Sequence, residues 1–74
     1  MSEDELASIL KERYENAKRN EAALQVHLFG IEFAKEIRAG GFTMAQLIQR
    51  ADISSGYAAE LSKGVKLSDY VRLL

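Results

Sequence analysis

Apolar residues recur at helical spacing over two adjacent stretches, residues 43–51 and 54–63. The positions that would face a core lie three or four residues apart and are Leu47, Ile48, Ala51, Tyr57, Ala58 and Leu61. Thr43 and Ser54 are good N-cap residues for these stretches, and Gly64 is a residue that often closes a helix. Ile53 lies between them, where an apolar side chain would plug the core. The pattern predicts two short helices joined by a tight turn over residues 43–64.

Two short helices joined by a turn of this kind can form a helix-turn-helix, whose second helix protrudes far enough to enter a DNA major groove. The positions that would face base edges hold Ser55, Gly56, Ala59, Glu60 and Lys63. The flanking positions suited to phosphate contacts hold Gln46, Gln49, Arg50 and Lys66. The first set lacks the Arg, Gln and Asn that usually bind guanine or adenine. Glu60 can accept from cytosine N4 but repels phosphate, so the alternative to sequence-specific reading is a helix-turn-helix-shaped protein-interaction or structural domain. For the four flanking residues the alternative is an ordinary solvated position.

The rest of the chain also shows helical spacing. Ser2 and Glu5 form a capping box with an acidic first turn, which predicts an amphipathic helix over residues 3–19. A helix over residues 30–39 would end at Gly40-Gly41, and a short fifth helix fits residues 68–74. Residues 22–29 alternate as in a strand but are rich in alanine, and we interpret them as an extended or irregular connection. The expected fold is all-α: one domain over residues 1–74, with four to five helices and a helix-turn-helix at residues 43–64.

Composition limits how such a chain is stabilised and where it acts. The 74 residues include no cysteine and one histidine, which excludes disulfides and nearly excludes a structural zinc site. A core of this size rarely supplies more than about 3–5 kcal/mol. One short helix also cannot cover the apolar residues between Ala22 and Ile37, so we expect a homodimer. No segment has the pattern of a signal peptide or a membrane span, and we expect a soluble, cytoplasmic protein.

The charge is unevenly distributed, although the net charge is only −1. Residues 1–37 carry a net charge of −3, and residues 38–74 carry a net charge of +2. The positive half contains the predicted helix-turn-helix, as a phosphate-binding surface requires. His27 is expected to be a packed or surface histidine, because no nucleophile and no metal-ligand spacing accompany it. We expect no catalytic residue, no metal, no cofactor and no small-molecule substrate.

Residues 38–74 resemble the lambda-repressor and Cro-type helix-turn-helix family. The resemblance rests on Gly40-Gly41, Thr43 with Leu47, Ser54 with Tyr57 and Leu61, and Gly64. The chain departs from the family at Ile48, where a small residue is usual, and at Asp52, where the turn usually has glycine. Asp tolerates the left-handed conformation, whereas Ile48 implies a wider helix crossing. The resemblance implies a DNA-binding transcription regulator that acts as a dimer.

A second resemblance covers most of the chain. The segments His27–Ile31 (H-L-F-G-I) and Lys63–Val71 (K-G-x-K-L-x-x-Y-V) are similar to short uncharacterised bacterial proteins with a helix-turn-helix-like region. This likeness implies no particular function. Two hypotheses therefore stand: a small DNA-binding transcriptional regulator, or a helix-turn-helix-shaped protein-interaction module that does not bind DNA.

Overall fold

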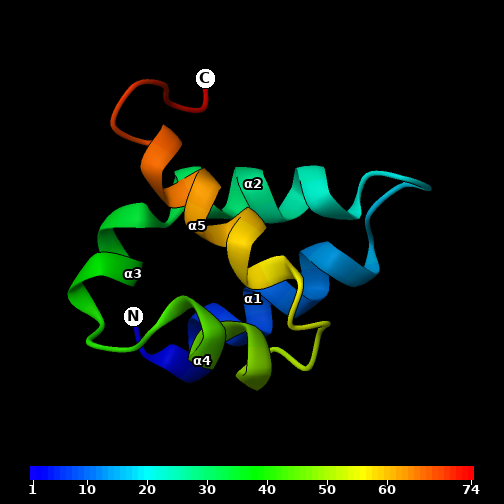
Figure 1. Ribbon diagram of the computed structural model, residues 1–74, viewed down its shortest axis with the longest axis horizontal. Coiled ribbons are helices and arrows are strands. Elements are labelled where there is room, and N and C mark those ends of the chain that lie inside the picture. Colours follow the sequence, from blue (N-terminus) through cyan, green and yellow to red (C-terminus); the bar gives the residue numbers. More distant parts are fainter.

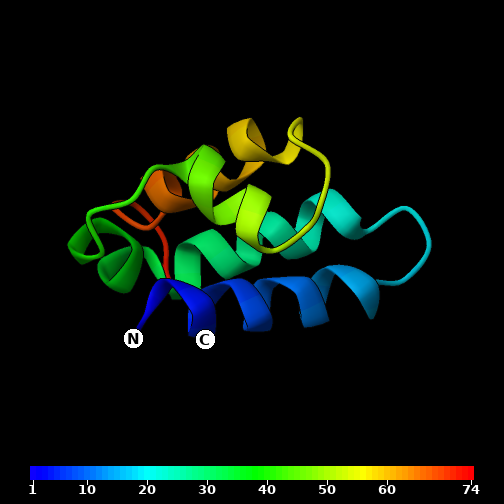
Figure 2. The same ribbon diagram turned by 90° about the horizontal axis from the view of Figure 1, so that it is seen from below.

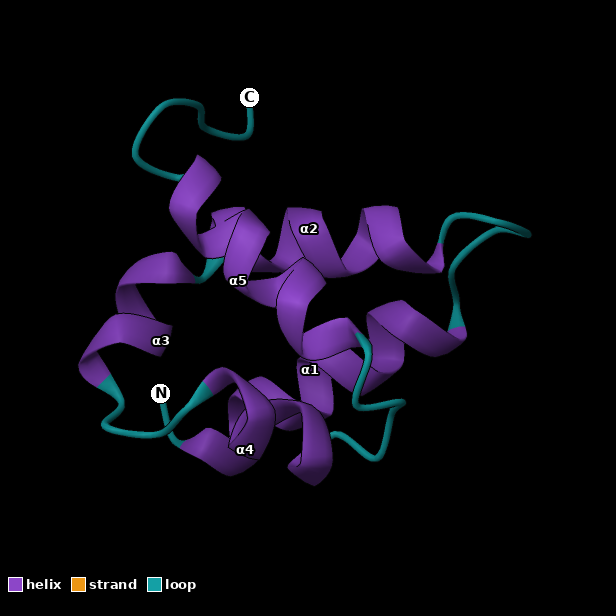
Figure 3. Cartoon of the chain, in the orientation of Figure 1, coloured by secondary structure: helices purple, strands orange, loops and turns teal.

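The computed structural model describes residues 1–74 and contains five helices and no strand (Figures 1 and 3). In chain order the helices are α1 (Glu3–Glu15), α2 (Ala22–Glu32), α3 (Ala34–Ala39), α4 (Met44–Arg50) and α5 (Tyr57–Leu67). Figure 2 shows α1 along one side of the molecule, with α4 and α5 on the opposite side. None of the helices has the length and apolar character needed to cross a membrane. The predicted all-α fold class is confirmed.

The five helices share one apolar core. Its buried side chains are Leu6, Ala7, Leu10, Val26, Phe29, Ala34, Ile37, Leu47, Ile48, Ala51, Leu61 and Val65. Phe29 is the largest of them and packs against the Phe33 ring with the centroids 4.9 Å apart. Burial of Leu47 and Leu61 was expected and is confirmed, whereas Ile53 and Tyr57 are only partly buried at the rim. Tyr57 meets Tyr14 of α1 edge to face at 5.2 Å, which ties the start of α5 to α1.

Two predicted helix starts are confirmed in detail. The Ser2 hydroxyl accepts from the Glu5 amide at 3.1 Å, and the Glu5 carboxylate accepts from the Ser2 amide at 2.9 Å. Thr43 and Gln46 form the same reciprocal box at the start of α4. The predicted cap at Ser54 is wrong, because α5 begins at Tyr57 with Gly56 in the N-cap position and no side-chain cap.

The prediction of an irregular connection over residues 22–29 is wrong, because these residues form most of α2. Helix α2 packs against both α1 and α5. A helix covered on two sides is apolar around most of its circumference, so its residues lose the one-sided pattern that identifies amphipathic helices. The predicted helix over residues 30–39 starts too late, since Gly30 lies inside α2 and the break comes at Phe33. Helix α1 ends at Glu15, short of the predicted residue 19.

The sequence suggested that Gly64 ends a helix, but this prediction is wrong. Gly64 lies buried inside α5. A Cβ atom on Gly64 would stand 2.5 Å from the carbonyl oxygen of His27, and one on Gly30 would stand 2.9 Å from the Leu61 carbonyl oxygen. The two glycines therefore let α2 and α5 cross with their backbones in contact. The predicted fifth helix over residues 68–74 is also wrong: a turn follows α5, and residues 71–74 have no helical structure.

Candidate functional site

Helices α4 and α5 form the two-helix motif that the sequence predicted, with a longer connection than expected. Asp52 has φ +60°, which confirms the left-handed turn residue. The Ile53 amide donates to the Ile48 carbonyl at 3.4 Å, and the Tyr57 amide donates to the Ser54 carbonyl at 3.0 Å. Ser55 and Gly56 consequently lie exposed in the turn before α5, outside the helix itself.

The outward face of α5 carries two lysines. Ala59, Lys63 and Lys66 are exposed and lie four and three residues apart, which places them on one side of the helix. Lys66 has no carboxylate within ion-pair distance, and Lys63 Nζ reaches only Glu60 Oε1 at 3.5 Å. The opposite face of α5 is buried in the core through Leu61 and Val65. Both ammonium groups are therefore available to an external anion.

Glu60 does not lie on this outward face, contrary to the prediction. Its Oε2 atom contacts Nε2 of His27 on α2, and both side chains are partly buried. The hydrogen bond from His27, and then the charge of Lys63, hold the pKa of Glu60 below its ordinary value of 4.5. His27 is a packed histidine, as expected, but it also turns the only acid of α5 toward α2. No local pattern predicts this pair, because its members are 33 residues apart in the chain.

The contact between Glu60 and His27 predicts that the stability of the fold depends on pH. A carboxylate whose pKa is lowered by folding contributes stability above its unfolded pKa, and that stability is lost as the pH falls through the folded pKa. We expect Glu60→Gln to be less stable than the unchanged chain at pH 7 and to lose less stability between pH 5 and pH 3. Urea unfolding followed by circular dichroism at several pH values measures both effects. Parallel losses in the two proteins would show that the Glu60 carboxylate contributes nothing.

Arg50 also has an internal partner. Its Nη1 atom donates to Asp4 Oδ1 at 2.7 Å, and its Nε atom donates to Glu3 Oε2 at 3.2 Å. The hydrogen bond with Asp4 is the main reason that the pKa of Arg50 is raised. The last turn of α4 is thereby fixed to the first turn of α1, and Arg50 points toward α1 rather than standing free beside the α5 face. The acidic first turn, which was expected to cap α1 and to favour its helix dipole, also supplies this contact.

Other charged residues also form ion pairs within the chain. Lys11 pairs with Asp52, Arg13 with Glu32, and Arg38 with Asp69, so each pair joins two different elements. Among the cations of residues 38–74, those with no partner or only a loose one are Lys63, Lys66 and Arg72. The positive charge that remains for an external partner is therefore concentrated on α5 and the segment after it.

The two glutamines of α4 have different surroundings. Gln46 Oε1 accepts from the Thr43 amide at 2.8 Å and is therefore engaged in the cap of α4. Gln49 is exposed and borders a hollow that is also lined by Ala45, Ile48, Ile53 and Ser55. This hollow brings Gln49 and Ser55 to one surface of the motif. The structure thus keeps Gln49 free for contact, while Gln46 performs a structural task.

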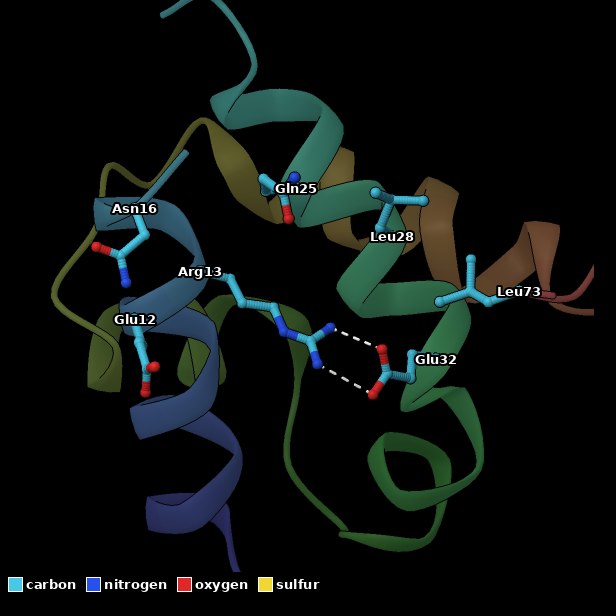
Figure 4. A pocket seen from close by; sticks show the side chains of 7 residues that line it. All are labelled: Glu12, Arg13, Asn16, Gln25, Leu28, Glu32 and Leu73. Atoms are coloured by element: carbon cyan, nitrogen blue, oxygen red, sulfur yellow. Dashed lines mark hydrogen bonds and ion pairs between the residues drawn. The ribbon is translucent and has the colours of Figure 1, made fainter. Parts of the chain in front are cut away.

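A second hollow, between α1 and α2, is shown in Figure 4. It measures about 280 Å³ and is lined by Glu12, Arg13, Asn16, Gln25, Leu28, Glu32 and Leu73. Arg13 donates two hydrogen bonds to the Glu32 carboxylate, at 2.8 and 3.0 Å, and these bonds lower the pKa of Glu32. The Arg13 guanidinium also lies 5.3 Å from the centroid of the Phe33 ring. The charge of Arg13 is already neutralised by Glu32. This pair joins α1 to α2, and the hollow has no free cation for an anionic ligand.

Comparison with protein families gives a match that covers nearly the whole chain. A family model described as an HTH-like domain matches residues 2–74. Comparisons with curated proteins and with solved structures give no match. The match includes α1 and α2 as well as the two-helix motif, and it supports a helix-turn-helix family without specifying the lambda-repressor and Cro type. With its two-helix motif built on α4 and α5, the chain belongs to the family of HTH-like domains.

Proposed function

We propose that this chain is a small DNA-binding transcription regulator of the lambda-repressor type, which binds duplex DNA as a homodimer through the outward face of α5. One observation carries the proposal: Lys63 and Lys66 share that face, while the only acid of α5, Glu60, is turned toward His27. A face that carries two cations, and whose one neighbouring acid is held by His27, attracts phosphate. Membership of the HTH-like family supports the same assignment.

The residues around the lysines suggest how the contact would work. Ser55, Gly56 and Ala59 are small and exposed, so they allow the backbone of α5 to approach a groove closely. Only the Ser55 hydroxyl among them can form a side-chain hydrogen bond with a base edge. Phosphate contacts from Lys63 and Lys66 would then supply most of the affinity, with Gln49 as a neutral neighbour. We propose a binding protein of modest sequence preference, with no catalytic role.

Replacing Lys63 and Lys66 with alanine tests this function. We expect the double variant to bind every duplex more weakly, because two phosphate contacts are lost. The slope of log K against log salt should become flatter by about one unit per contact. Fluorescence anisotropy of a labelled duplex, measured over a series of salt concentrations, gives both quantities. Both lysines are exposed, so their replacement should leave the fold intact, and circular dichroism checks this.

A matched control removes the same charge elsewhere. Lys18 and Arg19 lie exposed in the connection between α1 and α2 and have no ion-pair partner. Lys18→Ala with Arg19→Ala should leave the salt slope unchanged. If the two double variants lose affinity equally, binding depends on net charge alone and the α5 face is not the site.

A protein-interaction module without DNA binding is the second candidate. It is favoured by one observation, the exposed apolar side chains on α2 and in residues 67–74. Such clusters are typical of surfaces that bind proteins. The unchanged chain separates the candidates, because only the first requires salt-dependent affinity for duplex DNA.

A further inference from the structure

Nearly all of the exposed large apolar side chains belong to two parts of the chain. Apart from Met1, they are Leu24, Leu67, Tyr70, Val71, Leu73 and Leu74. All of these belong to α2 or to residues 67–74. Isolated exposed apolar residues are ordinary on a protein surface, but a cluster of this kind marks a contact surface.

Two residues of the segment after α5, Ser68 and Leu73, lie beside the C-terminal half of α2. Arg38 anchors the start of this segment, because it donates to the Asp69 carboxylate at 3.0 and 3.2 Å. Ser68 borders a hollow together with Ile31, and Leu73 borders the hollow of Figure 4 together with Leu28. Figure 1 shows the segment on the same border of the molecule as α2. We call this surface the α2–tail edge and define it by Leu24, Leu28, Ile31 and Leu73.

We propose that the α2–tail edge binds the same edge of a second copy of this chain, about a two-fold axis that passes near Leu28. This inference rests on the proposed function for its dimer and names the interface. Charge complementarity identifies the occupant. Glu21 is the N-cap residue of α2, at one end of the apolar stripe. Lys35 lies in the first turn of α3, beyond the break at Phe33, and borders the hollow that Ile31 lines at the other end of the stripe. Neither has an ion-pair partner in the chain.

A two-fold axis across α2 makes the two copies of this helix antiparallel. Glu21 is then brought to the end of the stripe that carries Lys35 of the partner subunit, and the same pair forms a second time by symmetry. Opposite charges at both ends of an apolar stripe thus make the edge complementary to itself. A different partner would have to reproduce this arrangement independently.

The position of α5 agrees with this symmetry. In Figure 1, α5 crosses in front of α2, and α2 and the C-terminal segment lie along the upper border of the view. Figure 2 shows α5 on the side of the molecule opposite α1. A two-fold axis along the viewing direction of Figure 1 keeps both copies of α5 on the same side. Both could then face one duplex, as a dimeric helix-turn-helix protein requires.

Sedimentation equilibrium without DNA tests the interface in four proteins: the unchanged chain, Glu21→Lys, Lys35→Glu, and the variant with both changes. We expect the unchanged chain to dimerise at micromolar concentration. Each single variant places like charges together twice and should raise the dimer Kd by about tenfold. The combined variant restores opposite charges and should recover the Kd of the unchanged chain.

Glu21 lies at the N-terminus of α2, where replacement by lysine also places a positive charge against the helix dipole. Lys35→Glu is a single variant without this additional effect on α2. A monomeric unchanged chain would overturn the proposal and point to a different protein as the occupant. Single variants that dimerise normally, or a combined variant as weak as the singles, would also overturn it. None of these outcomes depends on DNA, so the result is independent of the salt-slope test of Lys63 and Lys66.

Discussion

Gly64→Ala is expected to destabilise the fold by about 3 kcal/mol, most of the stability of so small a domain. The new Cβ would stand 2.5 Å from the carbonyl oxygen of His27 and 3.0 Å from its Cα atom. These are backbone atoms inside α2, so they cannot rotate away, and α2 and α5 must separate. Separation would loosen the packing of both helices in the core. Alanine normally favours a helix over glycine by about 1 kcal/mol, a gain too small to offset the clash.

Urea unfolding followed by circular dichroism measures this loss. Gly56→Ala is the matched control, because Gly56 has the helical φ of −60° and only the Ser54 hydroxyl, at 3.9 Å, would lie near the new Cβ. We expect the control to change stability by no more than about 0.5 kcal/mol. A Gly64→Ala variant as stable as the control would mean that α2 and α5 do not cross at Gly64.

Leu61→Ala is expected to cost about 2–5 kcal/mol, enough to leave much of the protein unfolded at 25 °C. The Leu61 side chain has no exposed surface and lies on the inner face of α5, within the core shared by all five helices. Its loss removes apolar contacts and leaves a cavity that the surrounding helices can fill only in part. This cost falls directly on the helix that carries Lys63 and Lys66.

The same unfolding experiment on Leu67→Ala provides the comparison. Leu67 is the last residue of α5 and is 41% exposed, so the same chemical change there should cost less than about 1 kcal/mol. Equal losses at the two positions would be inconsistent with the orientation of α5, because they would require both faces of the helix to be buried alike.

The sequence by itself determined the local features of this protein. The capping boxes at Ser2 and Thr43, the left-handed residue at Asp52 and the two-helix motif all follow from residues close together in the chain. Exposure of Lys63 and Lys66 could also be predicted, because the apolar face of α5 repeats at helical spacing. Such features depend on hydrogen bonds and periodicity within a few residues, and a single sequence contains that information.

Only the tertiary structure decided the features that depend on distant segments. Residues 22–29 belong to a helix that α1 and α5 cover on two sides. A helix covered in this way lacks the one-sided apolar pattern that would identify it in the sequence. Gly64 suits both the end of a helix and a close crossing, and the backbone of α2 determined which of these applies. Arg50 and Glu60 have polar side chains that fit either an outward face or an internal pair. Their partners, 46 and 33 residues away in the chain at Asp4 and His27, come within reach only when the helices pack, so local sequence carries no signal of them.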